Sequence, residues 1–347
     1  MKALCYFGPY DVRYESVDDP KGQSVQDVIV KVDACSICGS DLHIYHGDGA
    51  AFIEGTGFCI GHEAIGEVVE SGSGVNRLKT GDKVMLPGAI GCGACGRCLA
   101  GNVRNCLNGR QQVFGLGPSL QGCQAELVRV PVGDFNLGLI PEGVSADQAL
   151  MLTDSQATAW FGCRQAEIGA GASVAIIGLG PIGLMAIESA FVLGASRVFA
   201  IDPIPERRDW AISLGAEALS PDEAMEMIKA ATQGLMVDCV VEAVGHDATI
   251  QLAIALTRRE GTVSVLGVNK NMEFPFPMGA CLSRGITFRI GTTSPPEMWR
   301  ELIPLVQQGR LKPERFITTR LMLSEGADAY RALDERRPGI LKTVISP

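Results

Sequence analysis

The first part of the chain, residues 1–155, contains many short runs in which apolar residues alternate with polar ones. Gly, Pro or Asp bounds these runs, and clear examples lie at 27–34, 64–72, 82–87 and 125–132. Alternation with a period of two is typical of half-buried β-strands, and frequent turn residues between short strands favour a partly closed β body. We therefore expect a mostly β domain here.

A second pattern begins at residue 156 and continues to residue 292. Short β-branched runs alternate there with longer amphipathic stretches, and the runs lie at 173–180, 197–202, 237–245 and 261–267. Strict alternation of strand and helix predicts an α/β fold, in which helices cover both faces of a doubly wound parallel sheet. This is the Rossmann pattern, and a length of 347 residues leaves room for it beside a second domain.

The last segment, 293–347, adds two predicted helices, at 296–309 and 324–335, and a closing strand at 341–346. We expect this segment to fold back onto the first domain. The predicted organisation is a discontinuous domain formed by 1–155 and 293–347, with a Rossmann domain formed by 156–292.

Charge and composition exclude several classes of protein. Hydrophobic residues make up 46% of the chain and charged residues 20%, which is typical of a globular protein. A net charge of −9 argues against nucleic-acid binding and against attraction to anionic membranes, since both need clustered Lys and Arg. The chain opens without an apolar leader, and Gly and Pro interrupt the apolar stretch 173–200. We therefore expect a cytoplasmic protein without a membrane span.

The cysteines are numerous and unevenly distributed. Eight of the twelve lie before residue 110, and no secretory signal accompanies them. A disulfide framework is therefore a poor interpretation, and metal ligation or simple burial is favoured. The first domain is expected to bind metal.

A glycine-rich fingerprint lies between a predicted strand and a predicted helix. Segment 178–183 reads GLGPIG and matches the pattern G-x-G-x-x-G. The first Gly makes a tight turn, the second lets a pyrophosphate approach the backbone, and the third permits close packing of helix and strand. Phosphate then meets the N-terminus of the helix. The candidate cofactor-binding residues are Gly178, Gly180, Pro181, Ile182 and Gly183.

The second Rossmann strand ends at Asp202, nineteen residues beyond Gly183. A carboxylate there can accept hydrogen bonds from the ribose hydroxyls of NAD and would repel the 2′-phosphate of NADP. This favours NAD. Arg207 and Arg208 are the evidence for NADP, because either could bind a 2′-phosphate. Alternatively, the two residues form a solvated first helical turn, with Arg207 near the adenosine ribose.

Four cysteines lie close together in a glycine-rich loop, with the spacing C-x2-C-x2-C-x7-C. Four thiolates at this spacing can form a tetrahedral zinc site that has no position for substrate and is therefore structural. An iron–sulfur cluster is the alternative, but the bacterial ferredoxin pattern needs a closer fourth Cys followed by Pro. The four residues are Cys92, Cys95, Cys98 and Cys106.

A second set of candidate metal ligands is scattered along the chain, and no spacing rule connects its members. It consists of Cys38 in SICGSDLH, His62 and Glu63 in GHEAIGE, and Asp154 in LTDSQATAW. His62 is notable because the chain has only four His and this one lies beside Glu63 in a Gly-flanked run.

At this point a family resemblance is clear. The strings CGSDLH, GHEAIGEVVESG, GCGACGRC with its later Cys, GLGPIG and the C-terminal LKT resemble those of zinc-containing medium-chain alcohol dehydrogenases. They occur in the family's order and span nearly the whole chain. The resemblance implies a GroES-like catalytic domain with a structural zinc lobe beside the Rossmann domain. It also implies a catalytic zinc bound by Cys38, His62 and Asp154, with Glu63 able to enter the coordination sphere.

The resemblance implies further roles around that site. Asp41 would orient the His ligand, as is usual for metal-bound imidazoles. Ser40 would receive the proton of the alcohol, and His43 would be the outer member of the relay to solvent. Thr158 would lie near the nicotinamide, and Lys342 would contact the pyrophosphate.

The implied activity is reversible hydride transfer between an alcohol and NAD, with two zinc ions per chain. The segment LTDSQATAW is more similar to bacterial secondary-alcohol dehydrogenases than to polyol and butanediol dehydrogenases, which remain the alternative. A non-catalytic binding protein on this fold is expected to lose its ligands, and here they are present. We expect a homo-oligomer, a tetramer rather than a dimer, that acts on a small alcohol or ketone. Its substrate choice would depend on 45–58, 88–90, Phe114 and Trp299.

Overall fold

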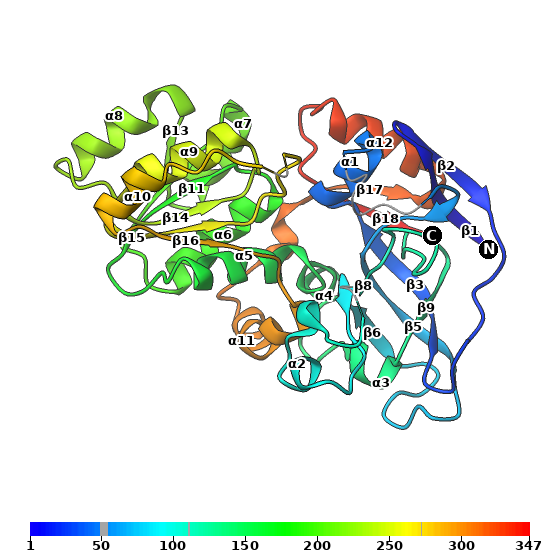
Figure 1. Ribbon diagram of the computed structural model, residues 1–347. Helices are drawn as coiled ribbons and strands as arrows, with labels where there is room; N and C mark the ends of the chain where they lie inside the picture. Colours follow the sequence, from blue (N-terminus) through cyan, green and yellow to red (C-terminus); the bar gives the residue numbers. More distant parts are fainter. Residues whose placement is uncertain (49–54, 110–111, 272) are drawn as a thin grey trace. The chain divides into compact units, whose positions relative to one another are not determined.

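The computed structural model describes residues 1–48, 55–109, 112–271 and 273–347. The chain forms two compact units, coloured along the sequence in Figure 1. Unit 1 consists of Met1–Ala157 and Ser294–Pro347, and unit 2 consists of Thr158–Thr293. The two ends of the chain therefore belong to the same unit.

The main sheet of unit 1 has the strand order β10-β6-β5-β3-β18-β17, and β9 also pairs with β3. The C-terminal strand β18 lies antiparallel to β3 and parallel to β17, so the last segment completes a sheet begun by the first. The strands are β3 (Val28–Ser36), β5 (Glu63–Ser71), β6 (Lys83–Leu86), β9 (Leu127–Val130), β10 (Gly138–Leu139), β17 (Ile317–Met322) and β18 (Lys342–Ser346).

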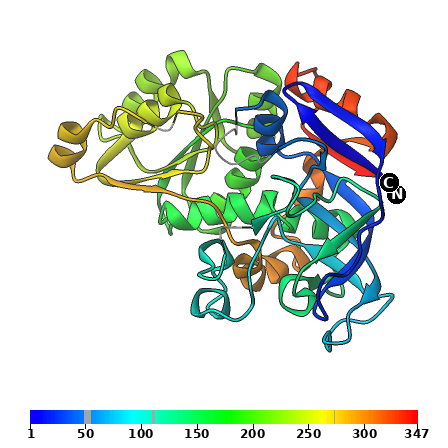
Figure 2. The ribbon, with the colours of Figure 1, turned by 45° about the vertical axis from the view of Figure 1, so that its right-hand side comes forward.

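Two smaller sheets complete the β body of unit 1. One has the order β2-β1-β4 and the other pairs β7 with β8. The N-terminal hairpin lies beside the C-terminal helix α12 in both views of the ribbon (Figures 1 and 2). These strands are β1 (Lys2–Gly8), β2 (Asp11–Ser16), β4 (Phe58–Cys59), β7 (Ala89–Ile90) and β8 (Gln112–Val113).

Short helices connect these strands. The helix α4 begins at a capping box, in which the side chains of Ser145 and Gln148 each accept a hydrogen bond from the other's backbone N–H. The helices of unit 1 are α1 (Gly39–His46), α2 (Gly96–Leu99), α3 (Gly133–Asn136), α4 (Ala146–Leu152), α11 (Pro295–Gln307) and α12 (Gly326–Asp334), with 3-10 turns at Val103–Asn105, Pro313–Phe316 and Leu323–Glu325.

Unit 2 is a six-stranded parallel sheet with the order β13-β12-β11-β14-β15-β16. This order reverses direction beside β11, and such a switch point is where doubly wound sheets bind nucleotides. The predicted α/β Rossmann fold is confirmed. The strands are β11 (Ser173–Ile177), β12 (Arg197–Ile201), β13 (Glu217–Leu219), β14 (Val237–Glu242), β15 (Thr257–Val265) and β16 (Thr287–Ile290).

The helices of unit 2 alternate with these strands. Pro at the first helical position, where no backbone N–H is needed, begins α6, α7 and α8. The helix α5 starts within unit 1 and continues into unit 2. The set is α5 (Ser155–Gln165), α6 (Pro181–Val192), α7 (Pro205–Ser213), α8 (Pro221–Ala231), α9 (Asp247–Leu256) and α10 (Met278–Arg284).

Each unit has its own hydrophobic core. In unit 1 the inward residues of β1, β3 and β5 pack with Tyr330 of α12, and in unit 2 the sheet packs against α8 and α9. Within the described parts of the chain, no helix combines the length and the apolar character needed to cross a membrane.

Candidate active site

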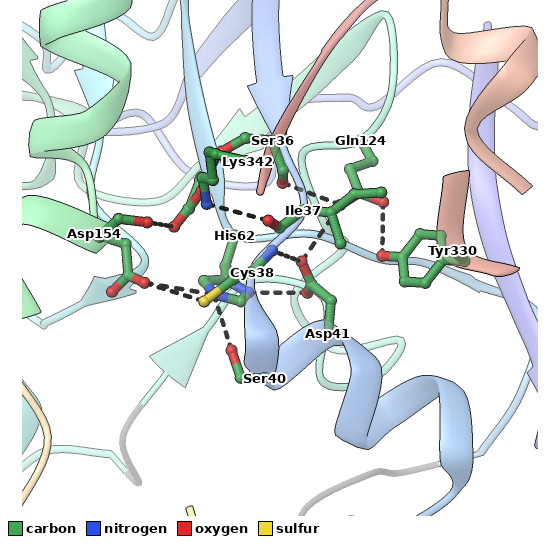
Figure 3. Close-up of polar contacts among 12 residues, drawn as sticks. Ser36, Ile37, Cys38, Ser40, Asp41, His62, Gln124, Asp154, Tyr330 and Lys342 are labelled. Carbon is green, nitrogen blue, oxygen red and sulfur yellow. Dashed lines mark hydrogen bonds and ion pairs between the residues drawn. The ribbon is translucent and has the colours of Figure 1, made fainter. Parts of the chain in front are cut away.

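Three side chains from distant parts of unit 1 converge on one point (Figure 3). Cys38 is the N-cap residue of α1, His62 directly precedes β5, and Asp154 lies between α4 and α5. Cys38 Sγ is 3.5 Å from Asp154 Oδ2, and His62 Nε2 is 3.9 Å from the same oxygen. One ligand atom from each residue lies within 4.8 Å of the other two.

The chemistry of this donor set fits a zinc ion. Burial raises the pKa of the Cys38 thiol, and the carboxylate of Asp154 raises it further. Burial, reinforced by the charge of Glu63, raises the pKa of Asp154 to about 6. A divalent cation would remove both penalties, and a thiolate, an imidazole and a carboxylate are ligands that zinc accepts. Three protein ligands leave a fourth position for water or substrate.

Asp41 orients the imidazole of this set. Its Oδ1 is 3.1 Å from His62 Nδ1, and its Oδ2 accepts a hydrogen bond from the backbone N–H of Cys38 at 2.9 Å. Asp41 is fully buried. Because Nδ1 faces this carboxylate, Nε2 is left to face the metal position, which is the arrangement that the family resemblance implies for Asp41.

Glu63 lies next to these ligands but forms a different set of contacts. Its Oε1 accepts from the hydroxyl of Ser155 at 2.6 Å, and its Oε2 is bound by Lys342 and Ser36. Burial alone would raise the pKa of Glu63, but the charges of Lys342 and His62 and the hydrogen bonds from Lys342 and Ser155 together outweigh it and lower that pKa to about 2. Glu63 is thus an ionised, fully buried carboxylate. Its direct coordination of a metal stays a prediction.

Lys342 is buried inside unit 1. Its ammonium contacts Glu63 and also donates to the carbonyl of Ile37 at 3.1 Å. The family resemblance implies a pyrophosphate contact for Lys342, whereas its ammonium forms an ion pair with Glu63 that no sequence pattern indicates. The pyrophosphate contact stays a prediction.

The two residues expected to carry protons lie on α1. Ser40 Oγ is 3.2 Å from His62 Nε2, so its hydroxyl lies directly beside the three ligands. The side chain of His43 is 30% exposed, and its Nδ1 is 4.0 Å from the carboxylate of Asp48. The relay between them stays a prediction.

The four cysteines of the glycine-rich loop lie close together around α2. One sulfur from each of the four residues lies within 4.8 Å of the other three. Backbone N–H groups point at these sulfurs. The N–H groups of Leu107 and Cys98 lower the pKa of the Cys95 thiol to about 6. Burial raises the pKa of the Cys98 thiol to about 12. Four thiolates this close need a cation between them, and the lobe fits a structural zinc. The members are Cys92, Cys95, Cys98 and Cys106.

The glycine-rich turn of unit 2 has the geometry of a phosphate cradle. Gly178 has a φ of +89°, a left-handed conformation that favours glycine. A Cβ on Gly183 would lie 1.8 Å from the carbonyl oxygen of Gly178, so only glycine fits there. Gly180 is the N-cap of α6 and a Cβ on it would meet nothing within 4 Å, which leaves its backbone open to a ligand. Pro181 and Ile182 form the first turn of α6.

Asp202 fastens this turn to the end of β12. Its Oδ2 accepts from the N–H of Leu179 and its Oδ1 from the N–H of Ile204, both at 2.8 Å. Arg207 reaches the same carboxylate at 3.8 Å, and Arg208 donates to the carbonyl of Asp202 at 2.8 Å. The carboxylate retains lone pairs for ribose hydroxyls, since two oxygens can accept about four hydrogen bonds.

The remaining predicted residues are placed as follows. Thr158 lies in α5 and is partly buried. Gly88 lies directly against the site, because a Cβ there would be 3.3 Å from His62 Cδ2. Phe114 is fully buried, and Trp299 donates to the carbonyl of Leu152. Of the substrate loop 45–58, residues 49–54 lie outside the described part of the chain.

Comparison with known proteins gives a consistent result. Residues 24–141 match the model of the alcohol dehydrogenase GroES-like domain, and residues 181–308 match that of the zinc-binding dehydrogenases. A protein of Mycobacterium tuberculosis named as a zinc-binding alcohol dehydrogenase is 42% identical over the whole chain and 89% of its own length.

Solved structures agree with these matches. An alcohol dehydrogenase from Thermus sp. ATN1 is 38% identical, with a TM-score of 0.92 over 100% of this chain and 99% of its own. The 2R,3R-butanediol dehydrogenase of Bacillus subtilis is 26% identical, with a TM-score of 0.86 over 100% of this chain and 99% of its own.

Proposed function

The chain belongs to the zinc-binding alcohol dehydrogenases, an oxidoreductase family, and on that premise we propose that it transfers hydride reversibly between a secondary alcohol and NAD. One observation carries the proposal: the buried thiol and imidazole of Cys38 and His62 and the partly buried carboxylate of Asp154 meet within 4.8 Å, beside the hydroxyl of Ser40. Such a set holds a metal and leaves room for a substrate oxygen.

The residues around this site would have the following roles in catalysis. Zinc supplies a Lewis acid that makes the alcohol more acidic, and the nicotinamide supplies the hydride acceptor. Ser40 would accept the hydroxyl proton, and His43 would pass it to solvent. Asp41 would keep His62 in the orientation that presents Nε2 to the metal.

We propose NAD rather than NADP as the cofactor. Asp202 is an almost fully buried carboxylate at the end of β12, and its charge would oppose a 2′-phosphate. Arg207 and Arg208 both turn toward Asp202, which leaves them poorly placed as independent phosphate ligands. Gly178, Gly180, Pro181, Ile182 and Gly183 would hold the pyrophosphate, with Thr158 beside the nicotinamide and Lys342 as a further contact.

A secondary alcohol is favoured by the glycine next to the metal ligands. Gly88 presents only backbone toward His62, so no side chain from this position fills the space on that side of the ring. The solved relative that acts on 2R,3R-butanediol also takes a secondary hydroxyl, and vicinal diols are therefore the second candidate substrates.

The chain is also proposed to form a homo-oligomer, a tetramer rather than a dimer. The strand β16 ends the sheet order of unit 2, and an edge strand offers unpaired backbone groups to a second copy. Ile290 at the end of β16 is 64% exposed, and Met278 and Leu282 of the preceding helix α10 are 67% and 81% exposed. Light scattering on the purified protein tests the assembly: a monomer at micromolar concentration would contradict the oligomer, and a dimer would contradict the tetramer.

The test of the proposed function joins metal content to activity. Mass spectrometry of the metals should find two zinc ions per chain, and oxidation of secondary alcohols should depend on NAD. The same panel should include primary alcohols, vicinal diols and NADP. Preference for vicinal diols would assign the second candidate substrate. One zinc per chain and no turnover of any alcohol would contradict the proposal.

A further inference from the structure

Gln124 lies in the middle of a buried chain of hydrogen bonds and one ion pair that ends at His62 (Figure 3). Its Oε1 accepts from the hydroxyl of Tyr330 at 2.9 Å. Its Nε2 donates to Asp41 Oδ2 at 3.4 Å and to the carbonyl of Ser36 at 3.2 Å. Asp41 Oδ1 in turn lies 3.1 Å from His62 Nδ1. Gln124, Tyr330 and Asp41 are all fully buried.

The chemistry of the partners fixes the orientation of this amide. An ionised carboxylate only accepts hydrogen bonds, so Gln124 must present its NH2 group to Asp41. Its carbonyl is then left for Tyr330, whose hydroxyl must donate. In the tautomer that leaves Nε2 for the metal, His62 carries its proton on Nδ1, which lies beside Asp41 Oδ1. Each donor therefore has one acceptor, and flipping the amide would place a carbonyl against a carboxylate.

The side chain of Gln124 packs closely against the backbone that precedes His62. A Cβ on Gly61, the residue before His62, would lie 2.4 Å from Gln124 Cγ, so the Gln side chain is pressed against the backbone that carries the ligand. Tyr330 is held in turn by the ring of Tyr45, with centroids 5.5 Å apart. The chain thus joins α12, close to the C-terminus, to the metal ligand.

From this geometry we propose that Gln124, anchored by Tyr330, is a positioning residue for the catalytic zinc site. Gln124 holds Asp41 in the orientation that directs the His62 ring, and so raises the affinity of the site for zinc. The same amide also donates to the backbone carbonyl of Ser36, and the hydroxyl of Ser36 contacts Glu63. Gln124 therefore helps to fix both buried carboxylates beside the ligands, Asp41 and Glu63. This inference rests on the proposed function, because it assumes that the Cys38, His62 and Asp154 set binds zinc.

The test uses two variants and a matched control. Gln124→Met keeps the length and volume of the side chain but removes both polar atoms. Tyr330→Phe keeps the ring and removes only the hydroxyl. Tyr45→Phe removes a hydroxyl from the adjacent ring, which is not part of the chain to Asp41. The zinc dissociation constant of each is measured by chelator competition on metal-stripped full-length protein, and cobalt substitution gives a visible spectrum that reports the ligand geometry.

Gln124→Met is expected to weaken zinc binding at the catalytic site by about tenfold, the lower end of the range for losing a direct outer partner of a ligand, because Gln124 acts through the direct partner Asp41. Tyr330→Phe should weaken it by about threefold, since Asp41 keeps its amide donor. Tyr45→Phe should leave it unchanged, and the four-cysteine site should bind zinc equally in all of them. In a cycle with Asp41→Asn, the effect of Gln124→Met should largely disappear, because both act through one contact.

A purely structural role would produce a different result. If both variants lose thermal stability but bind zinc within twofold of the parent, with an unchanged cobalt spectrum, the inference is overturned. Should Gln124→Met fail to fold, Tyr330→Phe alone decides by the same criterion. A parent protein that binds zinc only at the four cysteines would contradict the proposed function itself, and the inference would fall with it.

Discussion

Lys342 and Glu63 form an ion pair that is almost completely shielded from solvent, at 1% and 0% exposure. The two residues come from β18 and β5, which only β3 separates in the main sheet of unit 1. The contact joins the last strand of the chain to the backbone that carries His62. Its loss should therefore affect both the stability of unit 1 and the metal site.

Lys342→Met is expected to lower the free energy of unfolding by about 3–5 kcal/mol, because it leaves the Glu63 carboxylate buried without its cation. The measurement is urea unfolding of the zinc-loaded protein. Lys83→Met is the matched control, since Lys83 bridges Asp33 and Glu67 with 49% of its side chain exposed. The control should cost less than about 1 kcal/mol. Equal effects of the two substitutions would contradict a special role for the buried pair.

The carboxyl group of Asp134 leads to a prediction about how the stability of the fold depends on pH. Burial alone would raise the pKa of this carboxyl, but hydrogen bonds from the backbone N–H groups of Asn76, Arg77 and Leu78 outweigh it and lower the pKa. A lowered folded-state pKa adds stability above the unfolded-state value of about 4, and this stability is lost as the pH falls through the folded-state value.

Asp134→Ala should therefore cost about 2 kcal/mol at pH 7, and the difference from the parent should shrink below about pH 4. Urea unfolding of both proteins between pH 7 and pH 3 measures it. Asp82→Ala provides a control, because Asp82 accepts from the backbone N–H of Lys79 in a comparable turn. A difference for Asp134→Ala that stays constant down to pH 3 would show that its charge is not involved.

The features that spacing and periodicity predict are local ones, whereas the set of Cys38, His62 and Asp154 came from the family resemblance. The four cysteines lie between residues 92 and 106, and the fingerprint at 178–183 lies between one strand and one helix, so spacing alone predicts their geometry. The alternation of strands and helices likewise predicted the parallel sheet of unit 2, which the structure confirms. In each case the physical constraint acts over a few neighbouring residues.

Contacts between distant segments were not recoverable in this way. Lys342 and Glu63 are 279 positions apart, and Tyr330 and Gln124 are 206 positions apart. No periodicity links such pairs, because their meeting depends on how β18 and α12 pack against the N-terminal sheet. Gln124 in particular lies in the mixed run QGCQAE, in which no pattern distinguishes it from its polar neighbours.

Asp202 is predicted to set the choice of cofactor. Asp202→Gly should lower kcat/KM with NAD and raise that with NADP, moving their ratio at least about tenfold, equivalent to about 1.4 kcal/mol. Two causes contribute: the ribose loses an acceptor, and the 2′-phosphate no longer meets a carboxylate. Steady-state kinetics with both cofactors measures the ratio.

Asp202→Asn separates these causes. The amide keeps an oxygen that can accept from a backbone N–H, as Asp202 does from Leu179 and Ile204, but it carries no charge. It should therefore relax discrimination against NADP while keeping more of the activity with NAD. An unchanged cofactor ratio in both variants would mean that Asp202 only fastens the glycine-rich turn.

Ser40 is predicted to be the first proton acceptor. Its Oγ is 3.2 Å from the Nε2 of His62, so it lies within reach of an oxygen held beside that nitrogen. Ser40→Ala should lower kcat for alcohol oxidation by about 100-fold, the usual size of a lost acid–base group, and leave the KM for NAD nearly unchanged. Ser40→Thr keeps the hydroxyl and should retain much more of the turnover. The zinc content of both must stay at the parental value, since a loss of metal would imitate the effect. If the Ser40→Ala variant oxidises alcohol at the parental rate across the pH range, the proton leaves by another route. The segment at α1 would then supply only the ligand Cys38 and the residue that orients His62, Asp41.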